Sequence, residues 1–154
     1  MKIEYIRLKN FKSLQDIEMR DIPDMCVLVG ANGSGKSTLF SLFGFLKDAL
    51  TDNVHVALTK LGGSRGYQEV RSRNSEGPIE IELKFRDQPS SPLVTYSLTI
   101  SEENGRPIIE REALKYRRGS KGQPWRFLDF YRGQGTAVTN EPAEVTDVAE
   151  LVRD

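Results

Sequence analysis

A glycine-rich stretch constrains this chain more than any other feature of its sequence. Residues 30–38 read GANGSGKST, which matches the pattern G-x-x-x-x-G-K-[ST] of the phosphate-binding P-loop. Gly33 and Gly35 have no Cβ, so the backbone there can adopt positive φ and approach a ligand closely. Such a turn directs several N–H groups into one concavity, and the start of the following helix adds positive potential. The stretch therefore predicts an anion site.

Three side chains of this stretch have predicted roles. The ammonium of Lys36 is expected to reach the β- and γ-phosphates of a nucleotide and to act in catalysis. The hydroxyl of Ser37 is expected to ligate Mg²⁺, and that of Thr38 to bond the α-phosphate. The predicted ligands are ATP and Mg²⁺. The predicted binding residues are Gly30, Ala31, Asn32, Gly33, Ser34, Gly35, Lys36, Ser37 and Thr38.

The flanking residues support this interpretation. The apolar run Met25–Val29 predicts a buried parallel strand, with Cys26 as a small core residue inside it. After the loop, apolar residues recur at helical spacing, at Leu39, Leu42, Phe43, Leu46 and Leu50. The alternative is an ordinary glycine-rich turn with a surface lysine, but the order of strand, loop and helix favours the P-loop.

The whole chain sets wider bounds. Its 154 residues fit one domain with a real core. Lysine and arginine balance aspartate and glutamate at 22 each, so no global field attracts nucleic acid or a membrane. The N-terminus alternates apolar and charged residues, as a strand does and a signal peptide does not. We expect a cytoplasmic protein without a membrane partner.

The remaining elements follow from hydrophobic periodicity. Residues 3–9 and 17–22 read as two paired strands, 54–61 as either helix or strand, and 62–68 as a loop. A β-meander is predicted over 79–117, with strands at 79–85, 94–101 and 107–116. Asn104-Gly105 predicts a type I′ hairpin turn within it. From Glu141 the pattern indicates the start of a helical segment, 141–154.

Two segments together resemble a known family. Asn10-Phe11-Lys12-Ser13-Leu14, followed by VGANGSGKSTL at 29–39, is similar to the start of SMC/RecF/OLD-type ATPases. This branch of ABC-class ATPases includes proteins of chromosome organisation, DNA repair and phage defence. The resemblance implies an α/β fold, with a P-loop NTPase lobe of ABC/SMC type over residues 1–140. A mixed sheet would surround the P-loop helix and carry the antiparallel meander.

The same resemblance implies further site residues. Asn10, Phe11, Lys12 and Ser13 would lie near the nucleotide. Gln68 would help to hold Mg²⁺ and the attacking water, and Arg65 would contact phosphate, although a solvated polar loop explains both equally well. His55, the only histidine, has no nearby metal-ligating partners and is expected to be structural or exposed.

Some elements of such ATPases have no counterpart in this sequence. No apolar run ends in Asp-Glu, no Leu-Ser-Gly-Gly signature occurs, and no switch histidine follows. In the resembled families these lie in a C-terminal lobe, and two heads enclose two ATP molecules. The resemblance thus implies a parent ATPase that forms head dimers and acts on DNA. This chain alone should hydrolyse ATP slowly or not at all.

Two other classes of protein are compatible with parts of this sequence, a nucleic-acid-binding module and a small kinase or GTPase. Basic residues between Arg106 and Arg132 are interleaved with aromatic ones, which suits a nucleic-acid-binding module whose P-loop is structural or regulatory. A solvated hairpin whose aromatic side chains pack on the sheet is the preferred explanation of that segment. A small kinase or GTPase is disfavoured, because no guanine-reading motif and no lid-like arginine segment is evident.

Overall fold

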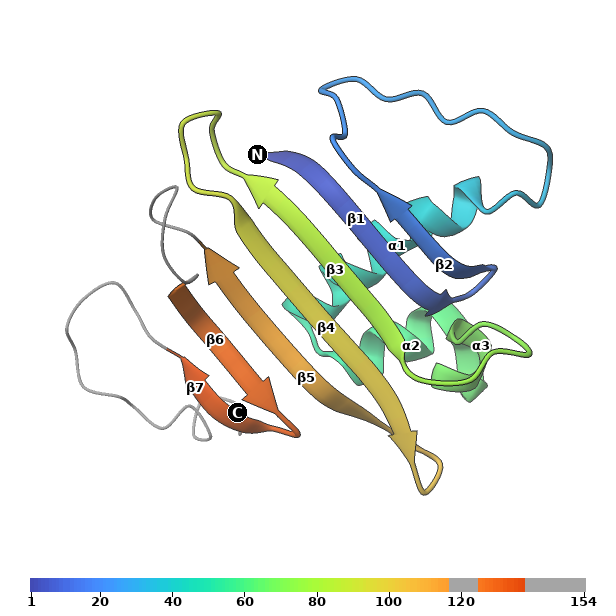
Figure 1. The fold of residues 1–154 in the computed structure, drawn as a ribbon. Helices are drawn as coiled ribbons and strands as arrows, with labels where there is room; N and C mark the ends of the chain where they lie inside the picture. The colour runs from blue at the N-terminus through green and yellow to red at the C-terminus, as the bar shows by residue number, and fades with distance from the viewer. Residues whose placement is uncertain (117–124, 138–154) are drawn as a thin grey trace.

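The computed structural model describes residues 1–116 and 125–137. These residues form one seven-stranded sheet, with helices against one of its faces (Figure 1). The strand order is β2-β1-β3-β4-β5-β6-β7, and every pair of neighbours is antiparallel. The strands are β1 (Lys2–Phe11), β2 (Leu14–Met19), β3 (Ile79–Arg86), β4 (Val94–Glu103), β5 (Arg106–Tyr116), β6 (Trp125–Tyr131) and β7 (Gln134–Ala137). The α/β class is confirmed, whereas the expected mixed sheet is wrong for the part of the chain described here.

The first hairpin is tighter than the sequence suggests. β1 ends at Phe11 and β2 begins at Leu14, so the predicted second strand at 17–22 is shifted. Asn10 and Lys12 both have positive φ, 56° and 51°, and this tight backbone reverses the chain within two residues. Asn and Lys at these positions accept the left-handed region at some cost, which explains why hydrophobic periodicity alone misplaces the turn.

The central meander matches its prediction. β3 and β4 pair in register, with Ile81 opposite Leu98 on the buried face, and β4 pairs with β5 with one register shift between Thr99 and Ile100. Asn104 and Gly105 have φ of 51° and 75°, as a type I′ turn requires. A second tight turn, with positive φ at Arg132 and Gly133, joins β6 to β7. β6 and β7 extend the meander beyond the strands that were predicted.

The helices cover one side of β1, β3 and β4, while β5 to β7 continue beyond them (Figure 1). They are α1 (Lys36–Thr51), α2 (Val54–Gly62), the short 3₁₀ helix η1 (Gly63–Arg65) and α3 (Tyr67–Val70). The ambiguous stretch 54–61 is therefore helical, and the Asn53 side chain caps it by accepting from the Val56 N–H at 2.9 Å. The loop predicted at 62–68 is wrong, because η1 and α3 occupy most of it.

The core lies between the sheet and these helices. Leu8, Ile79 and Ile100 from the strands are fully buried with Leu42 from α1. Phe11 at the end of β1 meets Phe45 of α1 edge to face, with ring centroids 5.9 Å apart. This contact fixes the middle of α1 against the end of β1, and so helps to position the helix that follows the P-loop.

The segment between β2 and α1 contradicts its prediction. Met25–Val29 is not a strand, and Figure 1 shows this connection arching away from the sheet. Met25, Val27 and Val29 are 81%, 71% and 91% exposed, and Cys26 is exposed instead of buried. The physical reason is the lack of a neighbouring strand among the described residues, since an apolar run forms a β-strand only where another strand can pair with its main chain.

The helical segment expected at 141–154 lies outside the described residues. Within the described part, none of the helices is long and apolar enough to cross a bilayer.

Candidate functional site

The P-loop turns sharply before α1, as its glycines predict. Gly33 and Gly35 have φ of 84° and 90°, a region that side chains rarely adopt. A Cβ at Gly33 would meet open space, whereas a Cβ at Gly35 would lie 2.5 Å from Cδ2 of Leu14. Gly35 thus lets the loop rest on the first residue of β2, while Gly33 serves conformation alone.

Lys36 reaches back over the loop that precedes it. Its Nζ donates to the carbonyl oxygens of Gly30 and Ala31, at 2.6 and 2.7 Å, and to Oγ of Ser34 at 3.1 Å. The ammonium is therefore held at the mouth of the loop and not extended into solvent. A phosphate placed there would meet this charge together with the amides of the turn.

The N-terminus of α1 adds positive potential beside the Lys36 ammonium. No side chain caps its first N–H groups, which leaves the positive end of the helix available to an anion. Oγ1 of Thr38 lies 2.8 Å from Oγ of Ser13, so a hydrogen bond joins the first turn of α1 to the β1–β2 turn. Ser37 is exposed beside them.

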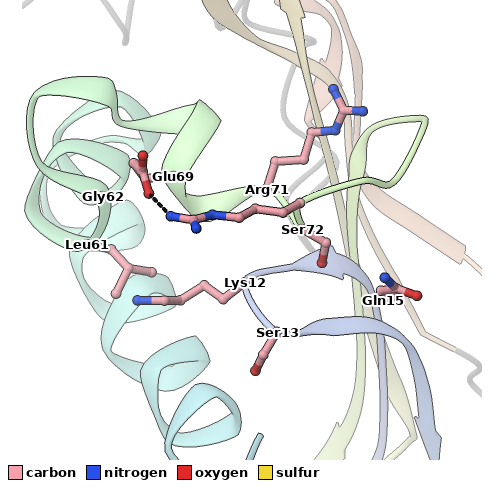
Figure 2. Close-up of a pocket in the computed structure, with 9 residues that line it drawn as sticks. Lys12, Ser13, Gln15, Leu61, Gly62, Glu69, Arg71 and Ser72 are labelled. Atoms are coloured by element: carbon pink, nitrogen blue, oxygen red, sulfur yellow. Dashed lines mark hydrogen bonds and ion pairs between the residues drawn. The ribbon is translucent and has the colours of Figure 1, made fainter. Parts of the chain in front are cut away.

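A cavity of about 610 Å³ opens next to this hydrogen bond. Figure 2 shows Lys12 extending across it from the β1–β2 turn toward Leu61 of α2. Glu69 of α3 lies on its wall and accepts from Arg65 at 3.4 Å and from Arg73 at 3.3 Å. The cavity is lined by Lys12, Ser13, Gln15, Leu61, Gly62, Glu69, Arg71, Ser72 and Arg73. Three of these are cationic and one is a carboxylate, so its lining has a net positive charge.

Main-chain bonds tie the wall of the cavity to the hairpin. The N–H of Lys12 donates to the Val70 carbonyl at 2.6 Å, and the N–H of Ser72 to the Asn10 carbonyl at 3.0 Å. Oγ of Ser72 also donates to the Leu14 carbonyl at 3.1 Å. The end of α3 and the β1–β2 turn therefore form one framework, which holds Lys12 and Ser13 beside the P-loop.

The four hairpin residues predicted near a nucleotide divide into two pairs. Lys12 and Ser13 line the cavity. Asn10 points elsewhere, since its amide donates to the carbonyls of Glu76 and Pro78, both at 2.9 Å. The Phe11 side chain has no exposed surface. The side chains of Asn10 and Phe11 are thus used by main-chain bonding and by packing, and they support the shape of the turn.

Two predicted residues beyond α1 have other partners in this structure. Nε2 of Gln68 donates to Oε1 of Glu102 at 3.3 Å, near the end of β4. Gln68 does not line the cavity, whereas Arg65 is engaged by Glu69 at its edge. Sequence reasoning overlooked Arg71 and Arg73, which flank Ser72 on the cavity wall. Their signal was the pair of arginines in Arg71-Ser72-Arg73, directly after the segment that holds Gln68.

The other candidates from the sequence, His55 and the basic segment between Arg106 and Arg132, form no ligand site within the described residues. His55 is exposed, and the described residues contain no cluster of three or more His, Cys, Asp or Glu that could hold a metal ion. In the basic segment, Arg111 and Arg126 both bond Asp129, and Arg132 lies within ion-pair distance of Glu103 and Glu110. Partial burial raises the pKa of Asp129, but the bonds from both arginines outweigh it and leave that pKa below its ordinary value.

These ion pairs favour the solvated-hairpin explanation of the basic segment. Phe127, on β6, stacks on Tyr116 with ring centroids 4.4 Å apart, as expected for an aromatic residue packed on the sheet. The predicted basic residues at 117, 118 and 121 lie outside the described residues.

Comparisons with known proteins match the chain to an ATPase family and to proteins of DNA repair. The family described as "AAA ATPase domain" matches residues 1–129. The DNA double-strand break repair Rad50 ATPase of Saccharolobus solfataricus is 31% identical over 106 residues, which is 66% of this chain and 12% of that protein. The DNA replication and repair protein RecF of Lactococcus lactis is 26% identical over 147 residues, 90% of this chain and 40% of that protein.

A second RecF, from Paenarthrobacter aurescens, is 29% identical over 87 residues and is matched over 22% of its length. The chain therefore spans well under half of each of these relatives. Because the family match covers most of the chain, the chain belongs to the AAA ATPase domain family, as the N-terminal region of an SMC/RecF-type, ABC-class P-loop ATPase.

Proposed function

We propose that this chain is the ATP-binding N-terminal lobe of an ATPase head that acts in DNA repair, DNA maintenance or phage defence. The observation that carries the proposal is the P-loop itself, with Lys36 held over the turn and α1 uncapped behind it. The β- and γ-phosphates would replace the carbonyl oxygens of Gly30 and Ala31 as acceptors of the Lys36 hydrogen bonds. The relatives' names support a role in DNA repair.

The cavity beside Ser13 would accommodate the rest of the nucleotide. The hydrogen bond between Ser13 and Thr38 joins the loop to the cavity, so a triphosphate in the P-loop would direct its nucleoside toward Lys12. The Lys12 ammonium would then contact ribose or α-phosphate oxygens. Asn10 and Phe11 would act from behind, by holding the turn in shape.

The residues present fit Mg²⁺ on the chemistry of their donor atoms. Hydroxyl and amide oxygens are hard ligands, which Mg²⁺ prefers, and it usually completes its shell with water and phosphate. Ser37 would be one ligand, and Gln68 the second once it leaves Glu102. The ion would neutralise phosphate charge between them.

One lobe is too little for fast hydrolysis. Phosphoryl transfer depends on positioning and on charge stabilisation from several directions, and this lobe supplies only the P-loop side. A C-terminal lobe would provide the acidic strand and the signature, and a second head would close the site. We expect the isolated chain to bind ATP weakly and to turn it over slowly or not at all.

Calorimetric titration with Mg-ATP tests this proposal. Lys36→Ala should weaken binding about 10- to 100-fold, since a hydrogen bond to a charged group contributes about 1.5–3 kcal/mol. Lys47→Ala, a change of the same type at an exposed position on the same helix, should leave the affinity unchanged. Equal binding by wild type and Lys36→Ala would refute a P-loop function.

The DNA-binding alternative is less well supported, because Arg111, Arg126 and Arg132 of the basic segment already have carboxylate partners. A titration with duplex DNA across salt concentrations would decide it. Several phosphate contacts predict a steep loss of affinity with salt, whereas paired arginines predict a weak and nearly flat response.

A further inference from the structure

A carboxylate lies in the wall of the cavity beside Ser13. Among the described residues that line this cavity, Glu69 of α3 is the only acidic one. Figure 2 shows it on the α3 side, while the Lys12 side chain enters the cavity from the β1–β2 turn. A cavity that received phosphate alone would be weakened by a negative charge in its wall, because like charges repel. The carboxylate therefore indicates a second kind of ligand group beside the phosphates.

Two arginines hold this carboxylate in a defined orientation. Oε1 of Glu69 accepts from Nη1 of Arg65 at 3.4 Å, and Oε2 accepts from Nη2 of Arg73 at 3.3 Å. A carboxylate has about four acceptor positions, and the Glu69 side chain is 34% exposed, so further donors can reach it. Both arginine side chains are largely exposed, and ion pairs of this kind contribute little to stability. The fold itself therefore does not require a glutamate at this position.

A main-chain hydrogen bond ties the backbone beside Glu69 to that of Lys12. The N–H of Lys12 donates to the carbonyl of Val70, the residue after Glu69, at 2.6 Å. The Lys12 ammonium and the Glu69 carboxylate therefore belong to neighbouring pieces of main chain and line the same cavity. Ser13, next to Lys12, is joined to Thr38 in the first turn of α1. In Figure 2, Lys12 lies between Ser13 and Glu69, so the cation is on the P-loop side and the carboxylate is beyond it.

This order of charges matches the order of groups in a nucleotide. A carboxylate repels phosphate but accepts hydrogen bonds from neutral donors. Next after its α-phosphate, a ribonucleotide presents the two hydroxyl groups of its ribose, and both can donate. With the β- and γ-phosphates in the P-loop, Lys12 would meet the α-phosphate and Glu69 would meet the sugar. The same carboxylate would disfavour a nucleotide bound the other way round, with its phosphates toward α3.

We infer that Glu69 accepts hydrogen bonds from the ribose hydroxyls of the bound nucleotide, and so makes the cavity selective for ribonucleotides over deoxyribonucleotides. The inference rests on the proposed function and adds to it the residue that recognises the sugar. Arg65 and Arg73 are positioning residues, because they orient the carboxylate. A site that bonds a hydroxyl rejects the analogue without it, since that analogue displaces water from the acceptor and returns no hydrogen bond.

Calorimetric titration of the 154-residue chain with Mg-ATP and with its 2′,3′-dideoxy analogue tests the inference. The wild type should bind Mg-ATP about tenfold more tightly than the analogue, at the lower end for a hydrogen bond to a charged group, because the carboxylate is partly exposed. In Glu69→Ala the two affinities should agree within about twofold. The melting temperature should stay near that of the wild type, since only exposed ion pairs are lost. Glu76→Ala, the same change at an exposed residue outside the cavity lining, should keep the tenfold preference.

Three outcomes would overturn this inference alone. The first is equal binding of the two nucleotides by the wild type, or a preference that persists in Glu69→Ala. The second is tighter binding of both nucleotides by Glu69→Ala at an unchanged ratio, which would make the carboxylate a competitor of phosphate for Lys12. The third concerns inosine triphosphate, which lacks the amino group of adenine. If Glu69→Ala lost only the preference for ATP over this nucleotide, the carboxylate would bond the base and not the sugar.

Failure of the proposed function has a different signature. Absence of Mg-ATP binding by the wild type, or equal binding by the wild type and Lys36→Ala, would overturn the P-loop function and with it this inference. Normal loss of affinity in Lys36→Ala together with any of the three outcomes above would leave the P-loop function standing and remove only the role of Glu69.

Discussion

Gly35→Ala gives the sharpest test of the P-loop geometry. The alanine would have to keep φ near 90°, which costs roughly 1–2 kcal/mol for a residue with a Cβ. Its Cβ would also lie 2.5 Å from Cδ2 of Leu14, and such overpacking costs about 1–3 kcal/mol. The two effects together cost about 2–5 kcal/mol in the phosphate-binding conformation, and the lower figure already corresponds to an affinity loss of about 30-fold.

Gly33→Ala provides the matched control. Its φ of 84° imposes nearly the same strain, but its Cβ would meet nothing within 4 Å. Mg-ATP titration should therefore show Gly35→Ala to be weaker than Gly33→Ala by about fivefold or more, the share due to overpacking. Thermal unfolding of both variants would show whether the change stays local to the loop.

A double-mutant cycle isolates the contact with Leu14. In a Leu14→Ala background the clash has no partner, so the cost of Gly35→Ala should fall to that of Gly33→Ala. Equal effects of the two glycine substitutions in the wild-type background, or an unchanged cost of Gly35→Ala without the Leu14 side chain, would refute this account of how the loop is seated.

Four further outcomes are expected. Lys12→Ala should raise the Kd for Mg-ATP about 5- to 10-fold in the same titration without lowering the melting temperature, since Lys12 lines the cavity. Phe11→Ala should cost about 3–5 kcal/mol in urea unfolding, because the ring is fully buried against α1; a cost below about 1 kcal/mol would contradict that packing. Cys26 should react with Ellman's reagent in native protein at a rate within about tenfold of that of a small thiol, because it is exposed. Slow labelling would instead support the sequence prediction that Met25–Val29 is a buried strand. Asp129 has a lowered pKa in the folded state, so its contribution to stability is present above its unfolded pKa of about 3.9 and is lost as pH falls through the lower, folded value. Asp129→Asn should therefore weaken the fall in the free energy of unfolding that acidification below about pH 4 causes, as measured by urea unfolding at several pH values.

The ion pairs of the outer strands explain why a charge count misleads here. Along the sequence the segment from Arg106 to Arg132 is strongly basic. In the folded chain, Arg132 lies beside Glu103, which the count leaves out because it precedes Arg106. Hairpin pairing brings such residues together, so the charge presented to a ligand is set by cross-strand neighbours and not by the linear sum.

Interactions between residues close in the chain are enough to predict the local elements of this protein. The glycine spacing dictated the turn at Gly33 and Gly35, and apolar periods of about four and two predicted α1 and the meander β3 to β5. These features depend on interactions between residues close in the chain, so a linear reading is sufficient for them. The hairpin turn at Asn104 follows from the same local chemistry.

Tertiary structure alone decided what these elements meet. Asn10 and Phe11 belong to the framework because Pro78 and Phe45, far along the chain, occupy their neighbourhood. The cavity exists because the end of α3 bonds the turn that carries Lys12. Met25–Val29 has the composition of a strand but no described strand beside it, since pairing is a property of two segments and a composition belongs to one.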